Sequence, residues 1–383
     1  MDDFIYLDCN ATTPTDPRVA EAMAPFLTGF FGNPSSGHRA GREAKAAIEG
    51  ARSQVAGCLG CAPGEIVFTS GGSESDNLAL RGVVAAAGGG HVVTSAVEHP
   101  AVLETALAME MGGLIRLTVV GVDDQGRADP DEVAAAIADD TVLVSIMLAN
   151  NEVGTLQPVA EIAARCRSRG VLVHTDAAQA VGKIPVDVED LGVDLLTVAG
   201  HKLYAPKGIG ALFVREGVEI EPLIHGAGHE RRRRAGTENI LEIVGLGAAS
   251  EVVAAEATGE AGRLSAFRDR LRDRLTKGIP DIVEHAARAE RLPNTLSVSL
   301  PGVRAGDLLT SIGDRLAASA GAACHGVTVQ VSHVLAAMGV SPELALGTVR
   351  FSVGRFTTDE EVDRGAEIVL AAMEAGGSSA STA

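Results

Sequence analysis

Two side chains of complementary chemistry follow two neighbouring apolar runs in the middle of this sequence. Asp176 comes shortly after the run at residues 171–173, and Lys202 comes shortly after the run at residues 193–198. Short apolar runs that end in a polar cluster predict buried parallel strands, whose carboxyl ends meet at one edge of a sheet. We therefore expect Asp176 and Lys202 to face the same crevice.

A lysine amine and a carboxylate in one pocket suit pyridoxal phosphate. The amine forms a Schiff base with the cofactor aldehyde, and the carboxylate keeps the pyridine nitrogen protonated so that the ring accepts carbanion electrons. A lone lysine after a strand is more often a surface residue. The strand-end position of both Asp176 and Lys202 is what favours the cofactor site.

A candidate phosphate cradle lies at residues 70–77, between an expected strand at residues 65–69 and a helix expected to begin at Leu78. Its glycines permit close backbone approach, Ser73 offers a hydroxyl, and a helix amino end attracts anions. The segment lacks the lysine of a P-loop, which argues against a nucleoside triphosphate. An ordinary Gly/Ser cap is the alternative.

Several other residues carry a chemical and a structural interpretation. His99 follows a strand, where an imidazole can stack on a planar cofactor or simply cap a helix. Asn33 and His38 occur in a turn-rich loop and are either turn and cap residues or site residues. Cys58 and Cys61 form a single CxxC, which we interpret as structural because a zinc site needs a second pair.

The C-terminal third contributes a cysteine and an arginine. Cys324 lies among small residues, which predicts a loop carrying an exposed, mobile nucleophile, although isolated cysteines are often buried and inert. Arg350 belongs to a segment at the end of a strand, where an arginine can clamp a carboxylate with two parallel hydrogen bonds. The four arginines at residues 231–234 either grip an anion or form a solvated basic loop.

The elements that must position these residues alternate between strand and helix up to about residue 258. Such alternation predicts an α/β fold with a doubly wound, mostly parallel sheet and right-handed crossovers. We expect a large domain over residues 15–258 and a smaller α+β domain made of residues 1–14 and 259–375, which carries the cysteine loop. Two helices, at residues 241–255 and 264–277, are expected on either side of Gly259, and residues 376–383 are expected to be a disordered tail.

The composition restricts the partners. The chain has 383 residues, 46% of them hydrophobic, and a net charge of −18. So acidic a protein is a poor ligand for nucleic acid or an anionic membrane face. Small molecules or basic proteins are the expected partners, and we expect no metal. Five scattered cysteines do not make a disulfide framework, and we find neither a secretory signal nor a membrane span, so we expect a cytoplasmic protein.

The motifs together resemble those of the cysteine desulfurases, the class V branch of the fold-type I pyridoxal phosphate enzymes, with selenocysteine lyase as a close relative. The match covers nearly the whole chain. Its pieces are Tyr6-Leu7-Asp8, Asn10-Ala11-Thr12-Thr13-Pro14, Gly32-Asn33-Pro34-Ser35-Ser36, Thr69-Ser70-Gly71, Glu98-His99-Pro100, Asn150-Asn151-Glu152, His174-Thr175-Asp176-Ala177-Ala178-Gln179, His201-Lys202, His229-Glu230-Arg231, Gly236-Thr237, Cys324 and Arg350-Phe351-Ser352.

The resemblance implies a role for each matching residue. Lys202 would be the Schiff-base lysine, Asp176 would bind the pyridine nitrogen, and His99 would stack on the ring. Gln179 would contact the phenolic oxygen of the cofactor. The cofactor phosphate would be bound by Gly72, Ser73, His201 and Thr237, of which Thr237 would come from the partner subunit of a homodimer. The substrate carboxylate would be bound by Asn33, Asn151 and Arg350, and Asn151 would also border the cofactor. Cys324 would accept the sulfur.

Two features depart from the common desulfurase pattern. Ala199 stands where many members have a phosphate-binding serine, and the loop around Cys324 is closer to the selenocysteine lyase version. The first hypothesis is a desulfurase that converts L-cysteine to L-alanine, leaves a persulfide on Cys324 and passes sulfur to an acceptor such as an iron-sulfur scaffold. The second hypothesis is a selenocysteine lyase, and the third is a catalytically silent scaffold.

Overall fold

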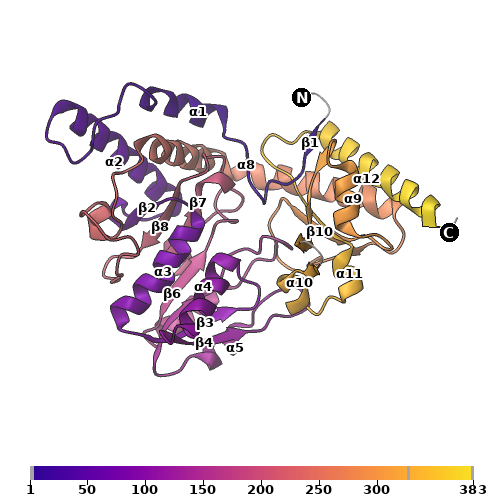
Figure 1. The fold of residues 1–383 in the computed structure, drawn as a ribbon, viewed down its shortest axis with the longest axis horizontal. Helices are drawn as coiled ribbons and strands as arrows, with labels where there is room; N and C mark the ends of the chain where they lie inside the picture. Colours follow the sequence, from indigo (N-terminus) through magenta and orange to yellow (C-terminus); the bar gives the residue numbers. More distant parts are fainter. Residues whose placement is uncertain (1–3, 326–327, 381–383) are drawn as a thin grey trace.

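A seven-stranded sheet forms the centre of the larger part of the molecule (Figure 1). The computed structural model describes residues 4–325 and 328–380, and the side chains of residues 257–258, 322–330 and 376–380 lie outside that description. Strand β8 is antiparallel to both of its neighbours, and the other pairs are parallel. In spatial order the strands are β2 (Ile66–Thr69), β8 (Gly210–Val214), β7 (Leu195–Ala199), β6 (Leu172–Asp176), β5 (Thr141–Ser145), β3 (Gly90–Ser95) and β4 (Ile115–Val120).

Both faces of this sheet are buried, which explains the continuous apolar runs in its sequence. Successive strand residues point to opposite faces, so Leu195 packs into one core and Leu196 into the other. One face is covered by α3 (Gly72–Ala87) and α4 (Pro100–Met111). The opposite face is covered by α1 (Pro17–Met23), α2 (Arg39–Leu59), α5 (Pro130–Ala136), α6 (Val159–Arg167), α7 (Val188–Leu191) and the start of α8 (Ile240–Gly278). The expected doubly wound, mostly parallel sheet is confirmed.

The C-terminal part has its own core and its own sheet, in the spatial order β12 (Ser319–Ala320), β15 (Thr348–Ser352), β10 (Thr295–Ser299) and β9 (Val283–Glu284). Helices α9 (Ala305–Ile312) and α12 (Asp359–Ala380) contribute to that core, and α10 (His333–Ala337) and α11 (Pro342–Leu346) lie nearby. Two short pairs complete it: β1 (Ile5–Tyr6) with β11 (Leu316–Ala317), and β13 (Ala322–His325) with β14 (Thr328–Val331). The proposed domain boundaries themselves stay a prediction.

Helix α8 is one helix of 39 residues, so the expected break near Gly259 is wrong. Its N-terminal turns pack with α2, and its C-terminal turns pack with α12 (Figure 1). A glycine costs a helix only about 1 kcal/mol relative to alanine. Packing against both parts of the molecule outweighs that cost at Gly259 and Gly262.

The N-terminal segment joins the two parts. Strand β1 pairs with β11, the Cys9 amide donates to the Ser352 carbonyl, and the Thr13 amide donates to the His201 carbonyl. The chain therefore runs from the C-terminal sheet along the carboxyl edge of the large sheet before α1 begins. This route brings Asn10 and Ala11 to the ends of β6 and β7.

Three local expectations are corrected. Helix α3 begins at Gly72, six residues before Leu78, because Gly71 takes a backbone conformation that only glycine adopts readily (φ 153°) and so ends the preceding turn there.

The backbone of Cys324 lies in β13, opposite Val329, where a loop was expected. Helix α12 continues to Ala380, so residues 376–380 are helical where a disordered tail was expected; a residue added to an existing helix gains a backbone hydrogen bond without a new nucleation cost.

None of the helices in the described residues is both long and apolar enough to cross a membrane.

Candidate active site

The carboxyl ends of β6 and β7 open into a pocket of about 440 Å³. Parallel strands deliver side chains to this edge, which is where open α/β sheets bind ligands. Asp176 is the last residue of β6, and Lys202 follows β7 in a short 3-10 turn, η3 (Gly200–Lys202). Most of the residues singled out from the sequence line the pocket: Gly72, Ser73, His99, Asn151, Asp176, Gln179, His201, Lys202 and Arg350.

The Lys202 amine is held by the N-terminal segment. Its Nζ donates to the backbone carbonyls of Asn10 and of Ala11, the latter at 2.9 Å. Burial lowers the pKa of this amine to about 8, assisted by the positive charge of Arg350 and opposed by Asp176. A neutral amine is a nucleophile and a base, so this environment prepares Lys202 for both roles near neutral pH.

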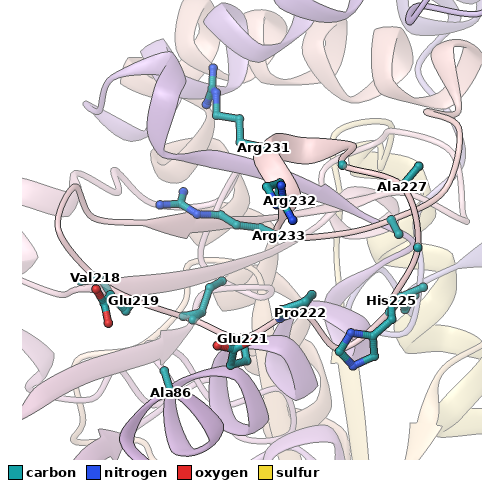
Figure 2. Close-up of a pocket in the computed structure, with 15 residues that line it drawn as sticks. Ala86, Val218, Glu219, Glu221, Pro222, His225, Ala227, Arg231, Arg232 and Arg233 are labelled. Atoms are coloured by element: carbon teal, nitrogen blue, oxygen red, sulfur yellow. The ribbon is translucent and has the colours of Figure 1, made fainter.

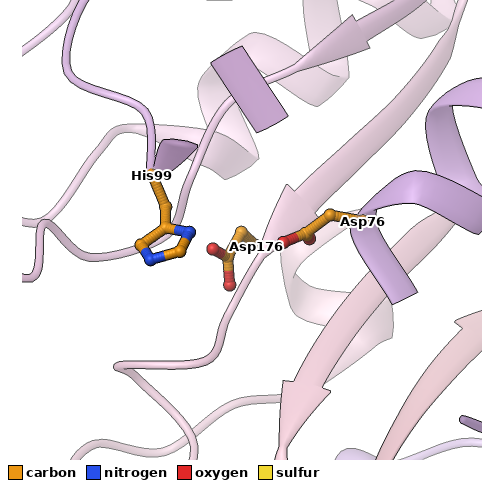
Figure 3. Close-up of side chains that lie close together, drawn as sticks. All are labelled: Asp76, His99 and Asp176. Atoms are coloured by element: carbon orange, nitrogen blue, oxygen red, sulfur yellow. The ribbon is translucent and has the colours of Figure 1, made fainter. Parts of the chain in front are cut away.

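Asp176 belongs to a cluster of three titratable groups (Figure 3). The ligating atoms of Asp76, His99 and Asp176 all lie within 4.8 Å of one another. Burial raises the pKa of both carboxyl groups, and in Asp76 the nearby Asp176 raises it further. Burial lowers the pKa of His99. Two carboxylates and an imidazole can also bind a metal, but the Arg350 guanidinium in the same pocket is positively charged and disfavours a cation there.

Sequence reasoning missed Asp76, which is 1% exposed and lies in the second turn of α3. Its Oδ1 is buried with no hydrogen-bond partner in the described residues. Asp76 could have been predicted, because a helix that begins at Gly72 turns its fifth residue toward the strand ends. It was missed because the helix was expected to begin at Leu78.

His99 has both of the interpretations that the sequence allowed. Its Nδ1 accepts from the Ala101 amide at 3.1 Å and so caps α4, and its ring also lines the pocket. The neighbouring Glu98 is fully buried, accepts from Ser95 Oγ at 2.5 Å and from the Met147 amide, and has a pKa raised by burial to about 8. The loop that carries His99 is therefore fixed from beneath.

The phosphate cradle has the expected close approach of backbones. A Cβ on Gly210 would come within 2.7 Å of the Gly71 backbone, and one on Gly72 would meet the Ala199 Cβ at 3.2 Å. Gly72 and Ser73 open α3, a helix of 16 residues, so its free amide groups and dipole face the pocket. His201 lies opposite, and burial lowers its pKa to about 4.

Arg350 enters the pocket from β15, and its guanidinium is already partly bound. One terminal nitrogen donates to the Asn151 carbonyl at 2.9 Å, and the other donates to Asp8 Oδ1 at 2.7 Å and to Ser319 Oγ at 2.8 Å. Its Nε is buried with no hydrogen-bond partner in the described part of the chain. An arginine held in this way is preorganised for a carboxylate.

Two predicted site residues, Asn33 and Thr237, do not line the pocket of this chain. Asn33 is exposed, and its Oδ1 accepts from the Ser35 amide at 2.9 Å, which is a turn role. Thr237 is exposed on the loop before α8. The side chain of Cys324 lies outside the described residues.

His38 and the CxxC cysteines lie away from the pocket. His38 caps α2 by accepting from the Gly41 amide. Cys58 and Cys61 are free thiols that pack against the core of the large sheet, and burial raises the pKa of both. A thiol with a raised pKa is a poor nucleophile near neutral pH, which agrees with the structural interpretation of this motif.

The four arginines at residues 231–234 contact different groups and do not converge on one point. Arg231 donates to the Gly64 carbonyl at 2.6 Å, and Arg234 pairs with Glu74 at 2.9 Å. Arg231, Arg232 and Arg233 border a second cavity of about 780 Å³, whose wall also contains Glu219 and Glu221 (Figure 2). This segment is anchored to the protein surface, and its mixed charge does not define an anion site.

The first pocket fits pyridoxal phosphate. It contains an amine for the aldehyde, a buried carboxylate for the ring nitrogen and a glycine-lined helix start for the phosphate. Two residues of its lining also have a buried polar atom that makes no hydrogen bond among the described residues: Asp76 Oδ1, which lies 3.7 Å from His174 Nε2, and Arg350 Nε. Buried polar atoms without hydrogen bonds are costly, so a polar ligand that reaches either atom would lower that cost.

Comparison with known proteins gives consistent matches. A model of the family described as aminotransferase class-V matches residues 5–364. A cysteine desulfurase IscS from Dictyoglomus turgidum is 45% identical over 362 residues, which are 94% of this chain and 92% of that protein. Among solved structures, a NifS-like protein is 38% identical with a TM-score of 0.91, covering 97% of this chain and 99% of that one. SspA in complex with cysteine is 34% identical with a TM-score of 0.80, covering 92% and 100%.

Proposed function

The chain belongs to the class-V aminotransferase family, and from this membership we propose that it is a pyridoxal-phosphate-dependent cysteine desulfurase. The reaction converts L-cysteine to L-alanine. Relatives at this level of identity are named cysteine desulfurases, which favours this function over selenocysteine lyase and over a silent scaffold. The observation that carries the proposal is the pocket where the Lys202 amine, the Asp176 carboxylate and Arg350 converge.

Bound pyridoxal phosphate supplies an electron sink for the carbanion that forms at the substrate α-carbon. Lys202 would hold the cofactor and then accept the α-proton on Nζ, which is the role its lowered pKa suits. Asp176 would keep a proton on the pyridine nitrogen. His99 would cover the ring, and Gln179 would donate to the phenolic oxygen.

The other proposed contacts hold the two anionic ends of the ligands. Gly72, Ser73 and His201 would bind the cofactor phosphate, and the exposed position of Thr237 supports a contribution from Thr237 of the partner subunit in a homodimer. Arg350 and Asn151 would bind the substrate carboxylate. Asn33, which is exposed and does not line the pocket of its own chain, would contribute to the same carboxylate only once the dimer forms.

Cys324 is proposed as the sulfur acceptor. Its thiolate would attack the substrate sulfur, forming the S–S bond as the substrate C–S bond breaks. The electron pair of that bond stays with the three-carbon fragment. The β-carbon takes up the proton released by the substrate thiol, the α-carbon regains its proton from Lys202, and the product leaves as L-alanine. The persulfide sulfur would then pass to an acceptor protein such as an iron-sulfur scaffold.

We also propose that the enzyme works in the cytoplasm. The cysteines at positions 9, 58, 61 and 166 are free thiols. Free thiols at several positions suit a reducing compartment, where disulfides are rare.

The test is Cys324→Ala assayed with L-cysteine and with L-selenocysteine. A thiol leaves poorly without a nucleophile, so the variant should release no alanine from L-cysteine while keeping its bound cofactor. A selenol is more acidic and its bond to carbon is weaker, so L-selenocysteine should still be processed. Undiminished cysteine turnover in Cys324→Ala would overturn the persulfide role, and a wild type active only on L-selenocysteine would overturn the desulfurase assignment.

A further inference from the structure

A second lysine lies buried directly behind the pocket wall. Lys183 is 8% exposed, and no carboxylate forms an ion pair with it among the residues that the structure describes. Its Nζ donates to Gln179 Oε1 at 2.5 Å. Burial lowers the pKa of this amine well below its usual value, and the nearby Lys202 lowers it further. A buried, unpaired amine is costly, and the pocket wall itself does not include Lys183.

The contact of Lys183 determines which way the Gln179 amide points. A glutamine amide has one acceptor oxygen and a nitrogen with two N–H groups. Gln179 Oε1 accepts from Lys183, and Gln179 Nε2 donates one N–H to the Asn10 carbonyl at 2.9 Å. The flipped amide would place Oε1 against the Asn10 carbonyl oxygen, and two acceptors repel. Both neighbours therefore select the same orientation.

In that orientation one N–H of Gln179 remains for the pocket, which Gln179 lines. The Asn10 carbonyl that receives the other N–H also receives the Lys202 amine. Lys183, Gln179, Asn10 and Lys202 thus form one continuous set of hydrogen bonds. The last member of this set, the Lys202 amine, binds the cofactor. A substitution at Lys183 should therefore change the titration of the Lys202 linkage.

We propose that Lys183 is a positioning residue: it fixes the Gln179 amide so that Nε2 donates into the pocket to the cofactor oxygen nearest the Lys202 linkage. A donor at this oxygen stabilises its anionic form. The linkage to Lys202 then loses its proton at a lower pH than it would without the donor. This inference rests on the proposed pyridoxal phosphate site.

The experiment is a pH titration of the visible absorbance of the holoenzyme. Lys183→Met removes the donor that orients Gln179 and should raise the midpoint of the titration by about half a pH unit to one unit. Lys183→Arg keeps a donor and a charge and should restore most of the wild-type midpoint. Lys277→Met, the same substitution at an exposed lysine near the end of α8, should leave the midpoint unchanged.

A double-variant cycle separates positioning from a simple charge effect. In a Gln179→Leu background, Lys183→Met should produce no further shift, because the group it positions is gone. An equal shift in both backgrounds, or no shift in Lys183→Met alone, would overturn the inference. Lys183→Gln, which retains a donor without the ammonium, keeps the test open if the methionine variant does not fold.

The same titration distinguishes the two proposals. A wild-type protein that never acquires the visible band contradicts the proposed function. A band that appears in every variant with one common midpoint contradicts only the role of Lys183.

Discussion

Two buried charged sites in this protein differ in how completely their polar atoms are bound. Behind the edge strand β2, Arg52 and Glu230 form two parallel hydrogen bonds of 2.8 Å, and Glu230 also accepts from the Phe68 amide. In the pocket, Asp76, Asp176 and Lys202 are largely withdrawn from water, yet Asp76 Oδ1 has no hydrogen-bond partner in the described residues.

The difference concerns what each site contributes. A fully hydrogen-bonded buried pair holds a segment in place, and here it fixes the loop that carries the four arginines to the sheet. Buried groups without strong partners destabilise the protein that contains them, and they shift their pKa values instead. Such groups are retained where a ligand will complete them. Mutations in the pocket should therefore lower activity with little loss of stability, and mutations of the Arg52–Glu230 pair should lower stability with little loss of activity.

The largest effect is expected for Lys202→Ala. Turnover of L-cysteine should fall by at least about 10⁴-fold, because both the cofactor attachment and the proton acceptor are lost. The thermal midpoint of the cofactor-free protein should change little, since removal of an amine whose pKa is lowered by burial offsets the loss of its two hydrogen bonds. Alanine release and calorimetry measure the two, and Lys277→Ala is the matched control. A marked loss of stability would mean that Lys202 belongs with the structural pair.

Asp176→Ala comes next. The variant should keep the visible absorbance of bound cofactor but lose about 10³-fold in alanine formation, because an unprotonated pyridine is a poorer electron sink. Asp176→Glu should recover part of the rate. Full activity in Asp176→Ala would show that another acid serves the ring nitrogen.

Glu230→Gln tests the other side of the comparison. It keeps the shape of the side chain but leaves the Arg52 guanidinium buried without its counter-charge. Denaturant unfolding should show a loss of about 3 kcal/mol, with catalysis by the folded fraction little changed. Glu49→Gln, which touches the same arginine from an exposed position, should cost far less. Equal losses in the two variants would contradict the distinction.

The smallest effect, and one of opposite sign, is expected for Asp76→Asn. Because the folded-state pKa of Asp76 is raised, the wild type is penalised at any pH above the unfolded value near 3.8, where the unfolded chain ionises more readily. Asp76→Asn should therefore stabilise the cofactor-free protein by about 1 kcal/mol at pH 7 and change little at pH 3. A loss of stability at pH 7 would show that the Asp76 carboxylate is satisfied after all.

The sequence predicted those site residues whose position follows from a local pattern of strands and helices. Asp176 and Lys202 were found because each follows a buried strand, and the sheet itself follows from apolar runs separated by helices. Asp76 was missed because the helix start was placed too late, and the break in α8 was wrong because packing outweighs the propensity of Gly259. The environment of Lys183 could not be predicted, since its hydrogen-bond partner Gln179 is in turn bound to the distant Asn10 segment.

That segment has a consequence for synthesis on the ribosome. The Asn10 side chain is held by Asn294 and Thr295, and the Asn10 backbone amide donates to the Ser352 hydroxyl, so these contacts span 284 to 342 residues of chain. The carbonyl that receives the Lys202 amine is thus set by parts of the chain that emerge last. In a nascent chain that ends before Ser352, the hydrogen bond from the Asn10 backbone to Ser352 cannot form, so the carbonyl that receives the Lys202 amine is less firmly held. We therefore expect the cofactor site to be completed late in biogenesis.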